Sequence, residues 1–217
     1  MTGQFATLPG PPARSGVRRA SAVLLVAAAL LFGHGAWIYA KASVAQVLLR
    51  RAWRLTVLGG TPVAPWPSAD TRPIARLRAP RFREDIIVLA GVSGRSLAFG
   101  PGHLTGSARP GEPGNCVISA HRDTQFAFLR QLEIGDVLEL ETPDGSRHRY
   151  RVFDRRVAPK TQVALLENTP DPTLTLVTCY PFDAVAPGGP LRYVVRARKE
   201  VNSSRSPSPS PGGRGLG

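Results

Sequence analysis

Six short segments between residues 85 and 197 carry the apolar pattern of β-strands. They are rich in Val, Ile, Leu, Tyr and Phe, and several alternate polar and apolar residues with a period of two. The predicted strands cover residues 85–89, 115–120, 136–141, 148–153, 174–179 and 192–197. Many short strands at close spacing, separated by turn signals, predict a closed or nearly closed β-barrel.

Two local signals lie between these strands. The segment Pro143-Asp144-Gly145-Ser146 predicts a hairpin turn, because Asp-Gly at the centre favours the backbone of a tight hairpin. Residues 125–132 predict a short helix, and Gly135-Asp136 then turns the chain into the next strand. The folded domain is therefore expected to be mostly β, with short helices only.

Residues 20–40 contain no Asp, Glu, Lys or Arg and are mostly apolar, which is long enough to cross a bilayer. Arg14, Arg18 and Arg19 precede this run, so the positive-inside rule predicts a cytoplasmic N-terminus and an exported remainder. The alternative is a cleaved signal peptide ending near Ala40-Lys41-Ala42. We expect an uncleaved single-pass anchor in the cytoplasmic (inner) membrane.

The segment after this run predicts a helical stalk. Val44, Val47, Leu48 and Leu55 are expected to share one helical face, which would lie on an anionic membrane surface or pack on the following domain. Gly59-Gly60-Thr61-Pro62 ends the predicted helix, and a stiff linker rich in proline follows.

Composition and charge indicate how the chain is divided into domains. Of 217 residues, 42% are apolar, which is enough for a core, and 22 Gly and 21 Pro argue against a helix bundle. Much of the net charge of +13 lies outside the predicted barrel, and no nucleic-acid reader motif appears, so we expect no nucleic-acid partner. We predict a basic arm at 1–19, a transmembrane signal anchor at 20–42, stalk and linker at 43–74, the barrel at 75–200 and a disordered Ser/Pro/Gly tail at 201–217.

Three residues with complementary chemistry stand at strand ends. His121 follows one predicted strand, Cys179 closes another and Arg192 opens the last. A cysteine nucleophile needs a nearby base or positive charge, a histidine can protonate a departing amine, and a guanidinium can stabilise an oxyanion. The alternative to a catalytic site is that the cysteine is buried in the core and that the histidine and arginine are ordinary surface residues.

The local sequence around these residues resembles that of the sortases, which are bacterial cysteine transpeptidases. Thr175-Leu176-Val177-Thr178-Cys179 has the Thr-Leu-x-Thr-Cys form of that family, Ser119-Ala120-His121-Arg122 is similar to its histidine segment, and Arg192 matches its arginine. The resemblance covers roughly residues 70–198, and Ala64-Pro65-Trp66-Pro67 before the barrel looks most like the proteobacterial members.

The resemblance implies an eight-stranded barrel that cleaves a sorting signal such as Leu-Pro-x-Thr-Gly through a thioester. Cys179 would be the nucleophile, His121 the acid/base and Arg192 the oxyanion or substrate-carbonyl donor. Thr178, Tyr180 and Arg122 would contact substrate. The partners would be a secreted protein with a C-terminal sorting signal and an unidentified amine, on the outer side of the membrane.

Some features depart from the family. The sequence has no acidic cluster of the type that binds calcium in some sortases, so we expect neither a metal nor a cofactor. The Asp-Pro-aromatic lid of pilin-polymerising sortases is also missing. Cys116 is expected to be a core thiol, although a disulfide to Cys179 would disable the enzyme. Two alternative functions are considered. One is that of an L,D-transpeptidase, whose Ser-His-Gly-Cys motif is absent here, and the other is that of a non-catalytic barrel that binds wall polymer.

Overall fold

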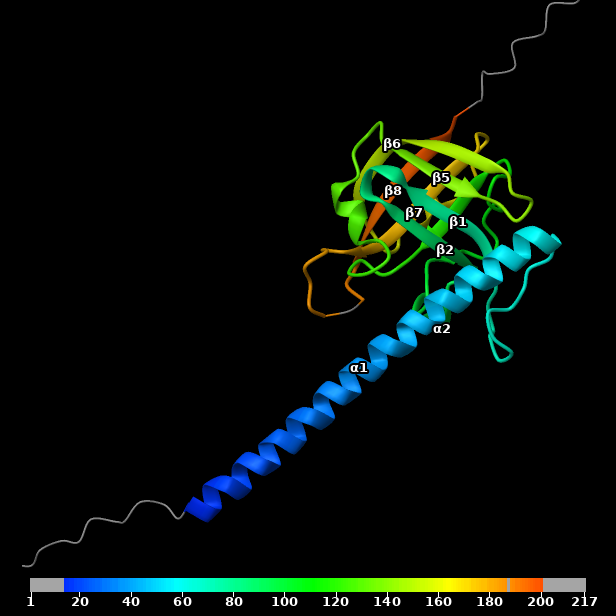
Figure 1. Cartoon of the computed structure of the whole chain (residues 1–217). Coiled ribbons are helices and arrows are strands. Elements are labelled where there is room, and N and C mark those ends of the chain that lie inside the picture. Colours follow the sequence, from blue (N-terminus) through cyan, green and yellow to red (C-terminus); the bar gives the residue numbers. More distant parts are fainter. Residues whose placement is uncertain (1–13, 187, 201–217) are drawn as a thin grey trace, which may run out of the picture. The chain divides into compact units, whose positions relative to one another are not determined.

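The computed structural model describes residues 14–186 and 188–200 (Figure 1). The chain divides into two compact units, Met1–Ala45 and Gln46–Gly217. The predicted tail at 201–217 and most of the predicted basic arm lie outside the described residues.

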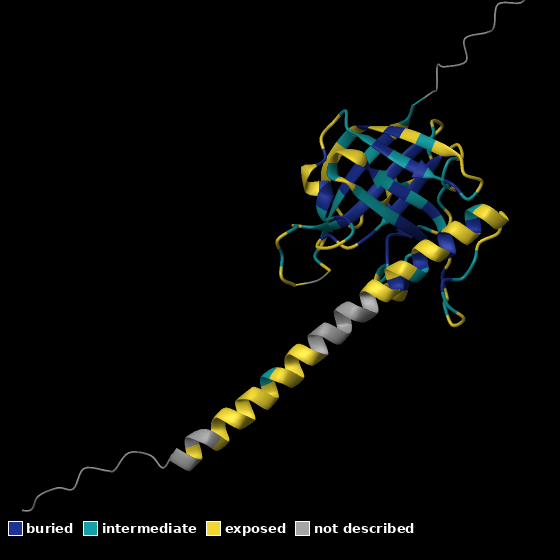
Figure 2. Cartoon of the chain, viewed as in Figure 1, coloured by how far each residue is buried: buried dark blue, intermediate teal, exposed yellow. Residues whose placement is uncertain are grey.

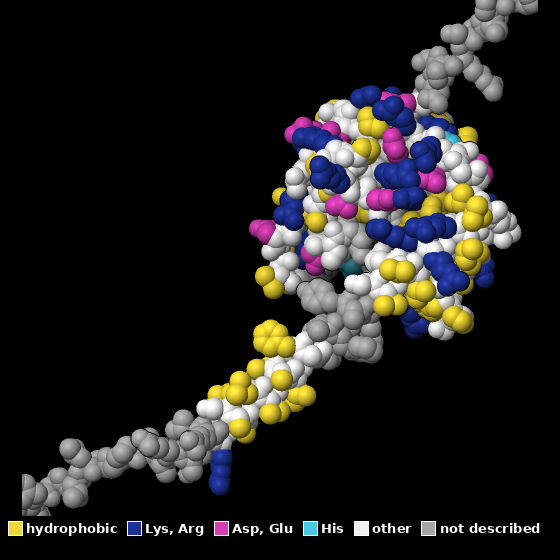
Figure 3. All heavy atoms as spheres, in the orientation of Figure 1, with side chains coloured by type: hydrophobic (Ala, Val, Ile, Leu, Met, Phe, Trp, Pro, Cys, Tyr) yellow, Lys and Arg dark blue, Asp and Glu magenta, His cyan; other side chains and the backbone are white. Residues whose placement is uncertain are grey.

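Helix α1 covers Arg14–Gly59 and includes the predicted anchor and stalk. Apolar side chains at its start are largely exposed, among them Leu24, Leu31 and Phe32 (Figure 3). Within the described part of the chain, no helical stretch combines the length and apolarity that a membrane span requires. The side chains of residues 34–42 fall outside that description, and the anchor at 20–42 stays a prediction.

The last turns of α1, which belong to the second unit, pack on the barrel through a face that the sequence did not predict. Leu49 and Trp53 are buried against Ile87 and Leu89 of the strand β2 (Glu84–Ala90), and Gln46 Nε2 donates a hydrogen bond to Phe99 O (2.7 Å). Val44, Val47 and Leu55 of the predicted apolar face are exposed, so that face does not pack on the barrel, and its alternative place on a membrane surface stays a prediction.

Eight strands close into a barrel in the order β1-β2-β3-β4-β7-β8-β6-β5. Six of them correspond to the strands predicted from the sequence, with ends that differ by one residue in β4 and β5 at the Ala120 and Asp136 positions. The remaining bounds are β1 Pro73–Ala79, β3 Gly102–His103, β4 Asn115–Ser119, β5 Val137–Glu141, β6 Arg147–Pro159, β7 Thr173–Tyr180 and β8 Leu191–Lys199. The closed β-barrel expected from the strand pattern is confirmed.

Alternation along the strands places one set of side chains inside the barrel. Val88, Ile118, Leu138, Leu174 and Leu176 belong to this core and are 0% exposed. Figure 2 shows the resulting checkerboard of buried and less buried residues over the sheet. Because the side-chain period of a strand is two, the odd-numbered residues of β7 face outward.

Three elements differ from the sequence prediction. β1 begins at Pro73, two residues before the predicted start of the barrel, and β3 has two residues only. β6 extends to Pro159 because a register shift between Val152 and Asp154 lets the polar stretch that follows pair with β8. The predicted helix at 125–132 is the 3₁₀ helix η2, Ala127–Gln131.

The other short helices are η1 (Pro80–Phe82), α2 (Gly94–Leu97) and η3 (Val163–Leu166). The predicted hairpin joins β5 to β6, where the Thr142 N–H donates to Ser146 O (2.9 Å) and the Asp144 carboxylate accepts from the Thr142 hydroxyl and the Ser146 N–H. Gly145 has φ 80°, a conformation that favours glycine and explains the Asp-Gly signal.

Charged side chains of both signs are intermixed on the visible face of the barrel (Figure 3). Ion pairs join Arg78 to Glu141 (3.0 Å), Arg156 to Asp154 (2.8 Å) and Arg81 to Asp136 (2.8 Å). The positive charge of the folded unit is thus partly neutralised by neighbouring carboxylates.

Candidate active site

The pairing of β7 with β8 places two of the predicted site residues directly opposite each other. Cys179 and Arg192 are cross-strand partners in this antiparallel pair. Side chains of directly opposed residues leave the sheet on the same face, with Cβ atoms about 4.5–5.5 Å apart. Both side chains are partly exposed, so the sulfur and the guanidinium share one accessible surface.

His121 lies beside them because β4 and β7 run parallel. Their register pairs Ser119 with Val177, and the Ala120 N–H donates to Val177 O (3.2 Å) just past the end of β4. His121 directly follows Ala120, and Cys179 lies two residues after Val177, so this pairing brings the two backbone segments close together. The imidazole is on an exposed residue, where a bound peptide can reach it.

Alternation puts Cys179 and Arg192 on the outer face of the barrel wall, and His121 is exposed just past the end of β4. Ile118, Ala120, Leu174 and Leu176 point into the core, so their odd-numbered neighbours point outward. Next to the site, this outer face carries a second apolar cluster, which η3 partly covers and which contains Val117, Ala158, Leu165, Val177 and Val194. The sequence alone did not indicate this cluster, because its members come from five separate segments.

The loop from residue 181 to residue 190 joins Cys179 to Arg192 along the chain and contacts two arginines. Arg192 Nη1 donates to Gly189 O and to Leu191 O (2.8 Å each). These bonds use one nitrogen of the guanidinium, whose Nε and Nη2 carry further donors for an incoming oxygen. Arg122 Nη2 donates to Ala184 O (2.5 Å) and Ala186 O (2.7 Å) of the same loop.

The residues predicted to contact substrate differ in accessibility. Thr178 is 1% exposed, and its hydroxyl donates to Ala120 O (2.7 Å), which ties β7 to the segment carrying His121. Arg122 is 7% exposed. Tyr180 keeps a partly exposed ring in a cluster with Phe182 and Tyr193 (centroids 6.2 and 6.3 Å away). Of the three, Tyr180 has the surface that a peptide could touch.

Cys116 is a free thiol in the core and is 1% exposed. Burial raises its pKa to about 12, so it carries no thiolate at neutral pH. Its partner on β7 is Leu174, five residues before Cys179, which corresponds to about 16 Å along the strand. A disulfide needs Cα atoms closer than about 7 Å, so the folded barrel cannot join these two cysteines.

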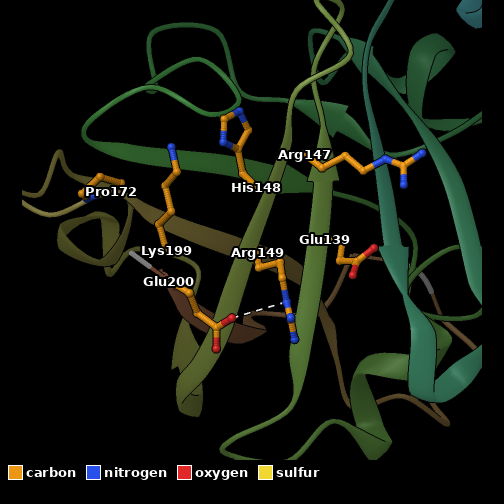
Figure 4. Close-up of a pocket in the computed structure, with 7 residues that line it drawn as sticks. All are labelled: Glu139, Arg147, His148, Arg149, Pro172, Lys199 and Glu200. Carbon is orange, nitrogen blue, oxygen red and sulfur yellow. Dashed lines mark ion pairs between the residues drawn. The ribbon is translucent and has the colours of Figure 1, made fainter. Parts of the chain in front are cut away.

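A separate pocket of about 470 Å³ lies between β5, β6 and β8 (Figure 4). His148 and Lys199 extend to the same side of it, while Arg149 and Glu200 form an ion pair (3.4 Å). Its seven lining residues are Glu139, Arg147, His148, Arg149, Pro172, Lys199 and Glu200, and they include neither a thiol nor a hydroxyl nucleophile.

Among the described residues, no group of three or more His, Cys, Asp or Glu side chains is arranged to hold a metal ion. The expectation that the protein needs no metal stays a prediction.

Comparison with known proteins gives a consistent family. Residues 77–200 match the family model described as the Sortase domain. Sortase D of Bacillus subtilis (strain 168) is 32% identical over 125 residues, which are 57% of this chain and 62% of that protein. The match thus spans less than two thirds of the length of that relative.

Solved structures agree on the fold. The Clostridium perfringens Sortase D5 transpeptidase aligns over 73% of this chain and 99% of its own, with a TM-score of 0.60 and 22% identity. Sortase C-1 from Actinomyces oris aligns over 59% and 75% respectively, with a TM-score of 0.54 and 27% identity. None of these matches tests the predicted proteobacterial subtype.

Proposed function

Because the chain belongs to the sortase family, we propose that it is a cysteine transpeptidase that cleaves a sorting signal and transfers the acyl group to an amine. Cys179 is the nucleophile, His121 the acid/base and Arg192 the donor to the oxyanion. The observation that supports this proposal is the register: Cys179 opposes Arg192 on β8, and the pairing of β4 with β7 ends two residues before both His121 and Cys179.

The first half of the reaction forms a thioester. The sulfur of Cys179 attacks the carbonyl carbon of the Thr–Gly bond, a carbon–sulfur bond forms, and the carbon–nitrogen bond then breaks. The thiol proton passes through His121 to the leaving glycine amine, so the amine departs neutral. The negative oxygen of the tetrahedral intermediate lies beside the Arg192 guanidinium, which remains charged at any working pH.

The second half transfers the acyl group. An acceptor amine attacks the thioester carbon, a carbon–nitrogen bond forms, and the carbon–sulfur bond breaks. His121 takes the proton from the attacking amine and returns a proton to the sulfur. The sorting signal is of the Leu-Pro-x-Thr-Gly type.

The partner of this reaction is a secreted protein with a C-terminal sorting signal, and the enzyme is held at the cytoplasmic membrane with its barrel outside. Support comes from the uncharged run at 20–40, the preceding arginines and the exposed apolar side chains at the start of α1. Washing membranes with alkaline carbonate tests this anchor. Release of the full chain into the wash would contradict it.

Incubation with a fluorogenic Leu-Pro-x-Thr-Gly peptide and an amine tests the activity. We expect cleavage and a thioester adduct on Cys179 by mass spectrometry, both absent in Cys179→Ala, and no cleavage in His121→Ala. Binding of wall polymer without cleavage, unaffected by Cys179→Ala, would instead support the non-catalytic barrel.

A further inference from the structure

Arg122 is a buried guanidinium immediately after the proposed acid/base. It is 7% exposed, whereas arginine side chains are mostly exposed because removing their charge from water is costly. Its Nη1 is also buried and has no hydrogen-bond acceptor in the described part of the chain. A buried donor without an acceptor destabilises a fold, so stability alone does not account for an arginine at this position.

The contacts of Arg122 are with the loop between β7 and β8. Nη2 donates to Ala184 O and Ala186 O, which lie 62 and 64 residues later in the chain. Between these two residues, the Val185 side chain is 100% exposed, so the tip of the loop turns its carbonyls inward and its side chain outward. One planar nitrogen group thus holds both carbonyls, a geometry that the single ammonium of lysine reproduces poorly.

This loop joins the strands that carry the other two residues. Cys179 lies two residues before it and Arg192 two residues after it, and Arg192 itself donates to Gly189 O. The loop therefore belongs to the side of the site that carries the nucleophile and the oxyanion donor. Arg122 adjoins His121, so its two bonds connect that side to the segment carrying the acid/base.

We propose that Arg122 is a positioning residue that fastens the β7–β8 loop to the His121 segment and so fixes the position of His121 relative to the Cys179–Arg192 pair. This inference rests on the proposed function. It replaces the sequence-based prediction that Arg122 contacts the substrate directly. Errors of about 1 Å in a catalytic arrangement can cost about 100-fold in rate, so a fastening of this kind acts on turnover rather than on peptide binding.

The experiment compares Arg122→Lys and Arg122→Gln in the full chain. Arg130→Gln is the matched control, because Arg130 also touches the loop, with its guanidinium 5.8 Å from the Phe182 ring, but is exposed. The measurements are kcat and KM on the sorting-signal peptide, hydrogen–deuterium exchange at residues 181–190, and the melting temperature.

We expect Arg122→Gln to lower kcat about 10- to 100-fold and to change KM little, with Arg122→Lys recovering part of the loss. Exchange should accelerate at residues 181–190 while the strands keep their protection, and Arg130→Gln should behave like the unmodified protein. A raised KM with unchanged kcat would overturn the proposal in favour of direct peptide contact. So would loss of protection throughout the barrel, or a fully active Arg122→Lys.

Failure of the proposed function is a separate result. If the unmodified chain neither cleaves the peptide nor forms an adduct on Cys179, the transpeptidase assignment fails. The exchange measurement still tests the loop contact in that case, because unchanged exchange at residues 181–190 in Arg122→Gln overturns the fastening role by itself.

Discussion

Cys179 on β7 and Arg192 on β8 oppose each other across one antiparallel pair. The spacing of sulfur and guanidinium is therefore set by backbone hydrogen bonds of the barrel wall rather than by a flexible loop. A site built on strands is held in a precise geometry, which suits the roles of nucleophile and oxyanion donor proposed for these two residues.

Arg192→Lys should leave the fold intact and lower turnover by about 10²–10³, the usual cost of losing one oxyanion donor. Lysine keeps the positive charge but loses the planar set of donors. Arg198→Lys is the matched control, because Arg198 lies on the same outward face of β8 at an exposed ion pair with Asp171 (3.6 Å). Peptide cleavage measures the effect, and equal activity in both variants would make Arg192 a structural residue.

Thr178→Val should reduce both stability and activity. The change leaves Ala120 O without its 2.7 Å donor and costs about 1–3 kcal/mol of unfolding free energy. It also loosens the tie between β7 and the segment that carries His121. Thr175→Val is the comparison, since its hydroxyl donates to Asn115 Oδ1 (2.6 Å) farther from the site.

Chemical denaturation and peptide cleavage separate the two threonines. We expect both variants to lose stability. When activity is divided by the folded fraction, only Thr178→Val should turn over more slowly than the unmodified protein. A parallel loss of activity in Thr175→Val would show that the site responds to general stability and not to this particular tie.

A thiol reagent should distinguish the two cysteines. In the native protein we expect iodoacetamide to modify Cys179 alone, because burial keeps the Cys116 thiol protonated and covered. In denaturant both should react. Intact-mass measurement counts the adducts, and two adducts on the folded chain would contradict the core position of Cys116.

Stability should fall with acidification partly through His148. The pKa of His148 is lowered mainly by burial and to a smaller extent by the charge of Lys199, while the charge of Asp144 opposes the shift. The unfolded chain, with an ordinary histidine pKa near about 6.5, then takes up the proton before the folded chain does as pH falls. This contribution is fully present above about pH 6.5 and is lost below it. Melting temperatures from pH 8 to pH 5 should fall less in His148→Gln, and identical slopes would contradict the assignment.

The sequence predicted the strands whose apolar residues are large and missed those whose inward residues are small. β1 buries Pro73, Ala75, Leu77 and Ala79, and alanine gives little strand signal beside two arginines. β3 is too short for any periodicity. Proline is tolerated as the first residue of a strand, so Pro73 is compatible both with a linker and with the start of a strand.

The roles proposed for His121, Cys179 and Arg192 come from residue types in a family order, but the pairing of the strands that carry them could not be predicted. It includes a parallel pairing between β4 and β7, whose partners are 58 residues apart, as in Ser119 and Val177. The contact of Arg122 with Ala184 spans 62 residues of sequence. A lone arginine after a histidine carries no local signal that it will be buried.

The distance between the two sulfurs also limits how oxidation could regulate the protein. With no second thiol of its own within reach, Cys179 can be capped only by something from outside, such as a small disulfide or a cysteine on another polypeptide. Redox inactivation would then scale with the concentration of that external agent and reverse with a reductant, while the barrel stays folded throughout.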